Sequence, residues 1–278
     1  MPVDTGSPLA RGRQRGFVAA TDQTRPIVSL RGVGKVFASG VRALDRFDLA
    51  VPEGEFVSLL GPSGCGKSTA LRIIAGLSEA SEGAVAWAGG AGAGPGHIGF
   101  VFQEPTLMPW ADVAANVRLP LKLADADPAH ASEAVARALA RVGLAEFAGA
   151  FPRELSGGMK MRASIARALV TEPELLLMDE PFAALDEITR FKLNNDLLNV
   201  WQELRRTVIF VTHSVFESVY LSQRIVVMTP RPGRVFAEIA VPVPYPRDEG
   251  FRTSADYAAL CRQVSQALDA AMGEAAAR

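Results

Sequence analysis

Apolar residues in this chain form short continuous runs, and these alternate with longer stretches in which they recur every three or four positions. Continuous runs are typical of strands buried on both faces, whereas the three-to-four spacing is typical of amphipathic helices. Strands are predicted at residues 27–31, 47–51, 55–60, 97–102, 175–178, 208–211 and 225–228. Helices are predicted at residues 67–77, 132–142, 157–170, 187–205, 215–221 and 254–277. Strands and helices in alternation predict an α/β fold.

The middle of the chain departs from this alternation. Residues 105–170 are rich in alanine at helical spacing, which predicts a helical insert in the α/β fold. Residues 88–96 are almost all Gly, Ala and Pro and predict a surface loop between two strands. Pro242, Pro244 and Pro246 are predicted to end the sheet. No internal repeat is found, and too little chain follows these prolines for a second domain.

The two ends of the chain are predicted to lie outside this fold. Residues 1–26 contain arginines but no apolar segment before a cleavage site, so they do not predict a secretory signal. A disordered tail is the prediction, and a transit peptide is the alternative. Residues 246–278 predict a C-terminal helical extension without a separate regulatory domain.

Composition narrows the class of protein. The 278 residues are 49% hydrophobic and 21% charged, an ordinary globular balance. A net charge of −1 argues against nucleic-acid binding, which usually requires a basic face. No apolar run approaches the length of about 18 residues that suggests a membrane span. Two cysteines, Cys65 and Cys261, are too few for a disulfide framework or a zinc site.

Gly61-Pro-Ser-Gly-Cys-Gly-Lys-Ser-Thr69 joins a predicted strand to a predicted helix. Its glycines let the backbone N–H groups curl inward around nucleotide phosphates, and Lys67 adds a charge to the same oxygens. Ser68 is suited to place a hydroxyl on Mg²⁺, and Thr69 begins a helix whose N-terminus favours the anion. The motif predicts a nucleotide site, but by itself it does not separate kinases, GTPases and transport ATPases.

Asp179 and Glu180 end an apolar strand. A carboxylate there is costly unless it is paired with a metal or a cation, and ligands of open α/β sheets bind at this edge. Asp179 is therefore predicted to hold Mg²⁺ through water, and Glu180 to polarise the attacking water.

Leu155-Ser-Gly-Gly-Met159 opens a helix between these two motifs and has the character of a second phosphate site. The chain already has one phosphate loop, so this segment is best explained if it serves the nucleotide of a partner subunit. It therefore predicts an ATPase that works as a face-to-face dimer.

Three single residues are predicted to belong to the nucleotide site because of their positions in the chain. His213 follows a predicted strand at the same sheet edge as Asp179, which favours contact with the γ-phosphate, and Gln103 ends another strand within reach of Mg²⁺ and water. Phe37 precedes the phosphate loop and is suited to stack on adenine. His97 and His130 are interpreted as structural.

Together these motifs resemble the nucleotide-binding subunit of an ATP-binding cassette (ABC) transporter, over residues 27–245. The resemblance implies a P-loop NTPase core, with a mixed sheet, flanking helices and N-terminal antiparallel strands. It also implies an inserted helical signature subdomain at about residues 105–170. The implied activity is ATP hydrolysis coupled to transport, with ATP and Mg²⁺ as cofactors.

The resemblance assigns a role to each matching residue. The nucleotide-binding residues it implies are Phe37, Gly61, Pro62, Ser63, Gly64, Cys65, Gly66, Lys67, Ser68, Thr69, Ser156, Gly157, Gly158 and Asp186. The catalytic residues it implies are Lys67, Gln103, Glu180 and His213. The metal-binding residues it implies are Ser68, Gln103 and Asp179.

Three further segments narrow the resemblance to one importer subfamily. Residues 101–110, 179–186 and 230–234 are similar to those of importers for nitrate, sulfonates, taurine and pyrimidine precursors of thiamine. The implied partners are a second copy of the chain, membrane permease subunits and, indirectly, a solute-binding protein, with no nucleic acid. The implied location is peripheral, on the cytoplasmic face of the membrane.

The chain departs from the family at a few positions. Phe37 stands where tyrosine is more frequent, and Met159 and Met161 stand where glutamine is frequent, so a polar contact from Met159 to the partner's nucleotide is not expected. Two alternatives remain open. One is a soluble ABC ATPase acting on nucleic acid or the ribosome, and the other is a P-loop kinase of small metabolites.

Overall fold

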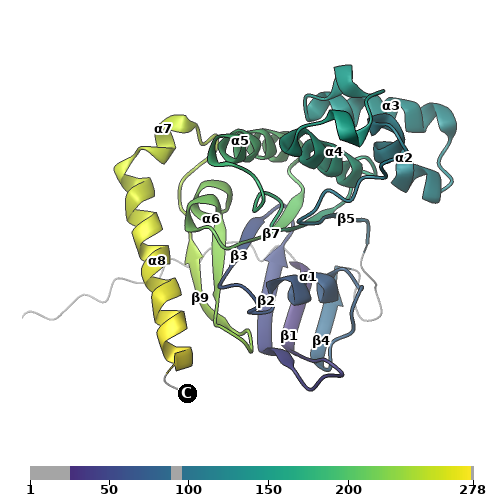
Figure 1. The fold of residues 1–278 in the computed structure, drawn as a ribbon. Coiled ribbons are helices and arrows are strands. Elements are labelled where there is room, and N and C mark those ends of the chain that lie inside the picture. Colours follow the sequence, from purple (N-terminus) through teal and green to yellow (C-terminus); the bar gives the residue numbers. More distant parts are fainter. Residues whose placement is uncertain (1–25, 89–95, 277–278) are drawn as a thin grey trace, which may run out of the picture.

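The computed structural model describes residues 26–88 and 96–276 (Figure 1). The predicted tail lies outside the described residues except for Pro26, which begins the first strand. Most of the predicted loop at residues 88–96 also lies outside them. Among the described helices, none combines the length and the apolar character needed to cross a lipid bilayer.

The described strands form two sheets. The larger sheet has the order β5-β6-β7-β3-β8-β9, in which the first five strands are parallel and β9 is antiparallel to β8. Its strands are β3 (Phe56–Leu60), β5 (Ile98–Val101), β6 (Leu175–Asp179), β7 (Thr207–Thr212), β8 (Arg224–Met228) and β9 (Val235–Ala240). The smaller, antiparallel sheet contains β1 (Pro26–Val36), β2 (Arg42–Pro52) and β4 (Glu82–Trp87). The predicted mixed sheet with N-terminal antiparallel strands is confirmed.

Alternating side chains of the central strands enter two different cores. Along β3, Phe56 and Leu60 join the core beneath the large helices, and Val57 and Leu59 join the core shared with the small sheet. Phe56 packs edge-on against Trp201, with ring centroids 5.7 Å apart. Every residue of β3 and β7 is buried, which explains why these strands are continuous apolar runs in the sequence.

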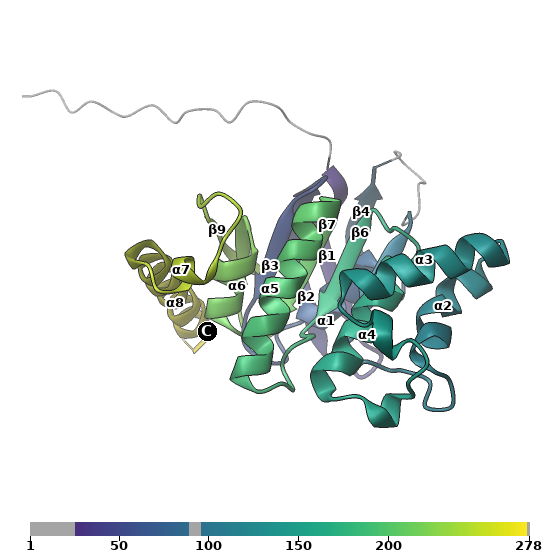
Figure 2. The same ribbon diagram turned by 90° about the horizontal axis from the view of Figure 1, so that it is seen from above.

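Three helices between β5 and β6 gather at one end of the larger sheet (Figure 2). They are α2 (Val113–Leu123), α3 (Pro128–Arg141) and α4 (Gly157–Leu169), with short 3₁₀ turns at Ala145–Phe147 and Pro152–Glu154. Helix α2 was not predicted, and it contains Pro120. Helix α3 begins four residues before its predicted start, because Asp127 caps it by accepting hydrogen bonds from the Ala129 and His130 N–H groups.

The other helices flank the sheets. They are α1 (Lys67–Ile74), α5 (Glu187–Leu204), α6 (Val215–Leu221), α7 (Glu249–Arg252) and α8 (Ala255–Ala276). Helix α1 ends three residues before its predicted end, next to Gly76 at φ +70°. Strand β9 was not predicted. It pairs with β8 before the chain reaches the prolines that were expected to end the sheet.

The segment that leads into the C-terminal helices is anchored by a buried arginine. Arg247 is 4% exposed, and its Nη1 donates to the carbonyl oxygens of Val219, Tyr220 and Ser222 at 2.9–3.0 Å. Its guanidinium carbon lies 4.2 Å from the ring centroid of Tyr245. These contacts attach the C-terminal segment to the end of α6.

Candidate functional site: a nucleotide cavity

The loop between β3 and α1 has a shape that only glycine permits. Gly64 and Gly66 have φ values of +74° and +106°, in the left-handed region that strains other residues. A Cβ on Gly66 would lie 2.7 Å from the Ala43 carbonyl oxygen, and one on Gly61 would lie 2.9 Å from Cys65 Sγ. The glycines therefore allow both the curl of the loop and its close packing on β2.

Lys67 lies inside this loop. Its side chain is almost fully buried, and its Nζ donates to the carbonyl oxygens of Gly61 at 2.9 Å and Pro62 at 3.0 Å. The same Nζ lies 3.3 Å from Oε1 of Glu180. The lysine therefore places its charge between the phosphate loop and the end of β6.

Ser68 and Asp179 form an oxygen pair beside the lysine. Ser68 Oγ donates to Asp179 Oδ1 at 2.8 Å. Burial raises the pKa of the Asp179 carboxyl, and the hydrogen bond from Ser68 partly opposes that rise. A hydroxyl and a carboxylate are the hard oxygen ligands that Mg²⁺ prefers, so the donor set fits this ion.

Glu180 is held in an unusual backbone conformation. Its φ is +46°, and its N–H donates to the Val211 carbonyl oxygen at 3.0 Å. Its Oε2 lies 3.0 Å from Nδ1 of His213. A non-glycine residue in this region is strained, and such strain is common at functional sites. The histidine and the glutamate are thus in direct contact, on the loops that follow β7 and β6.

A cavity of about 400 Å³ is lined by Lys67, Ser68 and Glu180, whereas their partners Asp179 and His213 do not line it. Its lining residues also include Phe37, Val41 and Gln103, together with Ser63, Gly64, Gly66 and Thr69 of the phosphate loop. The volume lies within the range of about 300–1,000 Å³ that is typical of ligand pockets. Phe37 is 42% exposed, and Lys35 Nζ lies 5.6 Å from its ring centroid, so one ring face is in contact with a cation.

Cys65 differs from its neighbours in the loop. Its side chain is 1% exposed, and it belongs to the core shared with the small sheet rather than to the cavity wall. Burial raises the pKa of its thiol. The Cys65 side chain is therefore not available to a nucleotide in this cavity, which leaves only its backbone for the predicted contact.

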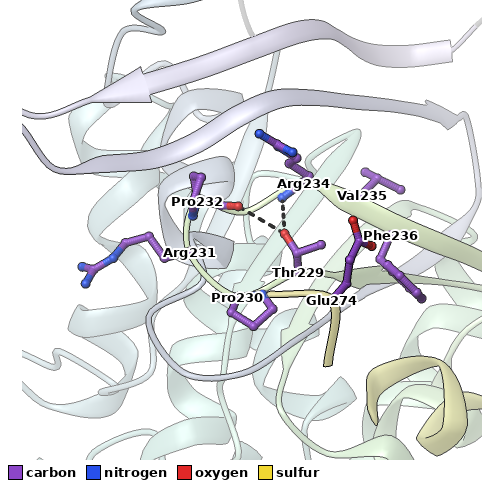
Figure 3. A pocket seen from close by; sticks show the side chains of 8 residues that line it. All are labelled: Thr229, Pro230, Arg231, Pro232, Arg234, Val235, Phe236 and Glu274. Atoms are coloured by element: carbon purple, nitrogen blue, oxygen red, sulfur yellow. Dashed lines mark hydrogen bonds between the residues drawn. The ribbon is translucent and has the colours of Figure 1, made fainter. Parts of the chain in front are cut away.

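Arg231 also lines the cavity, although no sequence motif predicts it as a site residue. It lies in the turn between β8 and β9, and its side chain points away from Phe236 and Glu274 (Figure 3). In the sequence, residues 230–234 indicate only a similarity to one importer subfamily. Nothing in the sequence placed this turn beside the phosphate loop, because the contact joins segments more than 150 residues apart.

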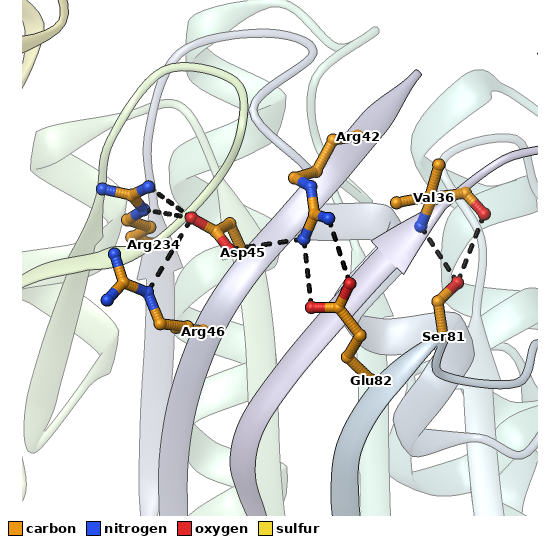
Figure 4. A network of polar contacts seen from close by, with 7 residues as sticks. All are labelled: Val36, Arg42, Asp45, Arg46, Ser81, Glu82 and Arg234. Atoms are coloured by element: carbon orange, nitrogen blue, oxygen red, sulfur yellow. Dashed lines mark hydrogen bonds and ion pairs between the residues drawn. The ribbon is translucent and has the colours of Figure 1, made fainter. Parts of the chain in front are cut away.

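The β8–β9 turn is fixed against the phosphate loop and β2. Gly233 N–H donates to the Ala43 carbonyl oxygen at 2.9 Å, and a Cβ on Gly233 would meet the Cys65 carbonyl oxygen at 2.1 Å. Arg234 pairs with Asp45, with Nε 2.8 Å from Oδ2 (Figure 4). This hydrogen bond from Arg234 lowers the pKa of the Asp45 carboxyl.

The other predicted nucleotide contacts do not line this cavity. Ser156 caps α4 by accepting from the Met159 N–H at 3.3 Å, and Gly157 and Gly158 form the first residues of that helix. A Cβ on Gly158 would lie 2.8 Å from Thr189 Cγ2, so glycine permits the close contact with α5.

Asp186 and the two unusual methionines lie close to this segment in the fold. Asp186 caps α5 by accepting a hydrogen bond from the Thr189 backbone N–H, and this hydrogen bond lowers the pKa of the Asp186 carboxyl. Met161 is 2% exposed and belongs to the helical core, and Met159 packs against that core from a half-buried position. Met161 is therefore a packing residue.

The fold and the cavity define a P-loop nucleotide-binding protein, and comparisons with known proteins identify its family. Residues 44–183 match the ABC transporter family. The chain is 49% identical to the taurine import ATP-binding protein TauB of Rhizobium johnstonii, over 71% of this chain and 76% of that protein. It is 41% identical to the aliphatic sulfonates import ATP-binding protein SsuB of Bacillus cereus, over 87% of this chain and 96% of that protein.

A solved structure supports the same conclusion. The ATP-binding cassette MJ0796, in a dimeric post-hydrolysis state bound to ADP and phosphate, matches with a TM-score of 0.68 and 33% identity, over 78% of this chain and 100% of that chain. The chain belongs to the ABC transporter family and is one of its ATP-binding subunits, an ATPase.

Proposed function

We propose that the chain is the ATP-hydrolysing motor of an importer for a small solute of the sulfonate or taurine type. The observation that carries this proposal is the import function in the names of two relatives at 49% and 41% identity. The proposed solute classes also include nitrate and the pyrimidine precursors of thiamine, which the sequence resemblance suggests. The alternative of a nucleic-acid or ribosome ATPase has no support in the relatives compared above or in the net charge of −1.

The proposed working unit is a homodimer with two ATP molecules between its subunits. The segment Ser156–Gly158 forms a capped helix N-terminus suited to an anion, yet it does not line the cavity of its own chain. Contact with the γ-phosphate held by the partner subunit would explain both observations. Asp186, which caps the neighbouring helix α5, is proposed to contact the partner from the same side.

Glu180 is proposed to polarise the attacking water, with His213 holding its carboxylate from 3.0 Å away. Lys67 is proposed to leave Glu180 and the loop carbonyls for the β- and γ-phosphate oxygens. Phe37, which lines the same cavity, is proposed to stack on adenine. Positioning and charge stabilisation would then supply most of the rate, as is usual in phosphoryl transfer.

Ser68, Asp179 and Gln103 are proposed to hold Mg²⁺. Ser68 and Asp179 are already in contact, and Gln103 lines the cavity together with Ser68. The bound ion would neutralise charge on the phosphate oxygens. The loop N–H groups and Lys67 would orient those oxygens relative to Glu180.

Membrane permease subunits are proposed to dock beside Gln103, on the helical subdomain at about residues 105–170. A groove of about 350 Å³ lies there between β5 and helices α2 and α4, and the exposed side chains of Phe102 and Leu123 are part of its wall. We propose that this contact holds the chain at the cytoplasmic face of the membrane. A solute-binding protein would then act through the permease, and residues 246–278 would remain an extension of the ATPase domain 27–245.

Purification of the tagged chain from its native membranes tests the proposal. A hydrophobic permease should copurify, and substituting Leu123 by Asp in the groove should abolish its recovery, whereas Phe147→Asp on the same helical block should not. Uptake of labelled taurine or an alkanesulfonate should require the chain. Recovery with ribosomes or nucleic acid instead of a permease would contradict the proposed function.

A further inference from the structure

A second and larger cavity lies between helices α5 and α6 and the C-terminal helices α7 and α8. Its volume is about 690 Å³, within the usual range for ligand pockets, and it shares no lining residue with the nucleotide cavity. Its wall includes Phe191 and Asn194 from α5, Phe216 and Glu217 from α6, Arg252 from α7 and Tyr257 from α8. Nothing in the proposed ATPase cycle uses these residues.

The wall of this cavity contains several buried polar atoms that lack hydrogen bonds. Asn194 is 0% exposed, and neither its Nδ2 nor its Oδ1 has a hydrogen-bond partner among the described residues. The same is true of Oε1 of Glu217 and of the Nε atoms of Arg190 and Arg252. Arg190 Nε and Glu217 Oε1 form only a loose ion pair, 3.7 Å apart. Unpaired groups of this kind are rare in folded proteins, and here the four residues that carry them all line one cavity.

The unpaired carboxamide of Asn194 indicates the chemistry of an occupant. It offers one donor and one acceptor side by side, and the edge that satisfies both at once is a cis-amide, in which an N–H lies beside a C=O. Lactams, primary amides and pyridones or pyrimidinones carry this edge.

The remainder of the wall favours a flat and uncharged molecule. The exposed ring of Phe216 lies 6.5 Å from that of Tyr257, at an interplanar angle of 31°, and Phe191 contributes a third aromatic surface. Carboxylates and guanidinium groups both line the cavity, so a ligand of either net charge would meet repulsion as well as attraction. A planar neutral heterocycle avoids that conflict.

The polar groups around the cavity are held in place before anything binds. Arg252 lies with its guanidinium carbon 3.6 Å from the ring centroid of Tyr220, and its Nη2 donates to Asn195 Oδ1 at 2.9 Å. The second carboxylate oxygen of Glu217 accepts from Thr212 Oγ1. Such preorganisation lowers the entropic cost of binding.

We propose that this cavity is a second ligand site, separate from the ATP site, for a small planar neutral molecule that presents a cis-amide edge to Asn194. Helix α5 follows Asp186, and helix α6 begins two residues after His213. An occupant of the cavity would therefore contact α5, which follows Asp186, and α6, which follows His213. It would also contact the C-terminal helices α7 and α8.

2-Pyridone, which carries the cis-amide edge, tests the site on the full chain by ligand-observed NMR and calorimetry. It should bind saturably, with about millimolar affinity for a probe of this size. N-methyl-2-pyridone lacks the N–H and should bind at least about tenfold more weakly. Leucine is close in size to asparagine but cannot form these hydrogen bonds, so Asn194→Leu should weaken the binding of 2-pyridone by the same factor as N-methylation does. Asn199→Leu, at an exposed position of α5, should leave the binding of 2-pyridone unchanged.

Several outcomes would overturn the proposal. They are no saturable binding up to the solubility of the probe, equal binding of the two pyridones, and displacement of a fluorescent ATP analogue by 2-pyridone. Unchanged binding in a folded Asn194→Leu variant would also overturn it. Phe216→Ala provides a second variant, because its exposed side chain can be removed without disturbing the core. It should weaken 2-pyridone, and unchanged binding there would contradict the predicted aromatic contact.

Discussion

At the scale of single residues, the nucleotide cavity is organised around Glu180. Its carboxylate lies 3.3 Å from Lys67 Nζ through one oxygen and 3.0 Å from His213 Nδ1 through the other. The backbone at Glu180 is in the left-handed region, so the loop after β6 is constrained to direct this side chain at both partners. Glu180 is thus the residue at which a change should separate binding from hydrolysis.

Glu180→Gln should keep ATP binding and lose turnover. The amide is close in size but cannot accept a proton from water, so the ATPase rate should fall at least about 100-fold. ATP should then hold the subunits together, and size-exclusion chromatography with ATP should show a persistent dimer. Glu146→Gln, at an exposed position, is the control and should hydrolyse ATP normally. A Glu180→Gln variant with wild-type turnover would exclude this role.

Arg231→Ala should weaken nucleotide binding. Arg231 is an exposed cation on the wall of the cavity proposed for ATP, and loss of one charge-assisted contact should raise the Kd for a fluorescent ATP analogue by about tenfold. Arg46→Ala removes a charge from the adjacent strand β2, at a position that does not line the cavity, and should change the Kd little. Equal effects of the two substitutions would mean that only the overall charge matters.

At this scale the sequence predicted the site residues that lie within contiguous motifs, but it did not predict a residue that the fold brings to the site from elsewhere in the chain. Lys67, Ser68, Asp179 and Glu180 lie in contiguous motifs, and the structure brings their side chains together. Arg231 lies in no such motif. Its place in the cavity depends on how the β8–β9 turn packs against β2, which residue order alone does not reveal.

At the scale of elements, the N-terminus of helix α4 does not line the cavity of its own chain. Ser156 is exposed, and Gly157 is exposed beside it, so an approaching surface can reach both. The N–H groups at such a helix start attract anions, and a bulky cation there would obstruct a partner subunit without touching the core.

Ser156→Arg should spare ATP binding in the isolated chain and prevent the ATP-dependent dimer. The dimer is best followed in the Glu180→Gln background by light scattering, and binding by fluorescence titration. Ala145→Arg, on the same helical block but away from the α4 N-terminus, should leave both properties intact. Loss of ATP binding by monomeric Ser156→Arg would show that the segment serves its own nucleotide site.

Elements with a strong local pattern were predicted well, and elements that depend on neighbours were not. Strands β3, β6, β7 and β8 are buried apolar runs and lie within a residue or two of the prediction. Strand β9 is half exposed and pairs on one side only, so its sequence lacks such a run. Helix α2 contains Pro120, a residue that usually argues against a helix.

At the scale of the whole molecule, the two cores meet at the central sheet, and the C-terminal helices cover its β8–β9 end. Their attachment depends on Arg247, whose guanidinium satisfies carbonyl oxygens at the end of α6 and near β9. Because these oxygens are buried, removal of the donor leaves them unpaired.

Arg247→Met should therefore lower the free energy of unfolding by about 3 kcal/mol, measured from the midpoint of urea denaturation. Arg262→Met, at an exposed position on α8, should change it by less than about 0.5 kcal/mol. Equal midpoints for the two variants would show that the anchor contributes no stability.

The burial of Cys65 has a practical consequence for work on this ATPase. The chain has only two cysteines, both are free and buried, and burial raises the pKa of each thiol, which disfavours the reactive thiolate. Nucleotide binding should therefore withstand mild oxidants and maleimides. A cysteine introduced on the surface, for example at Ala145, would react selectively without further mutagenesis, so spectroscopic labels can report the distance between the two subunits of the proposed dimer during turnover.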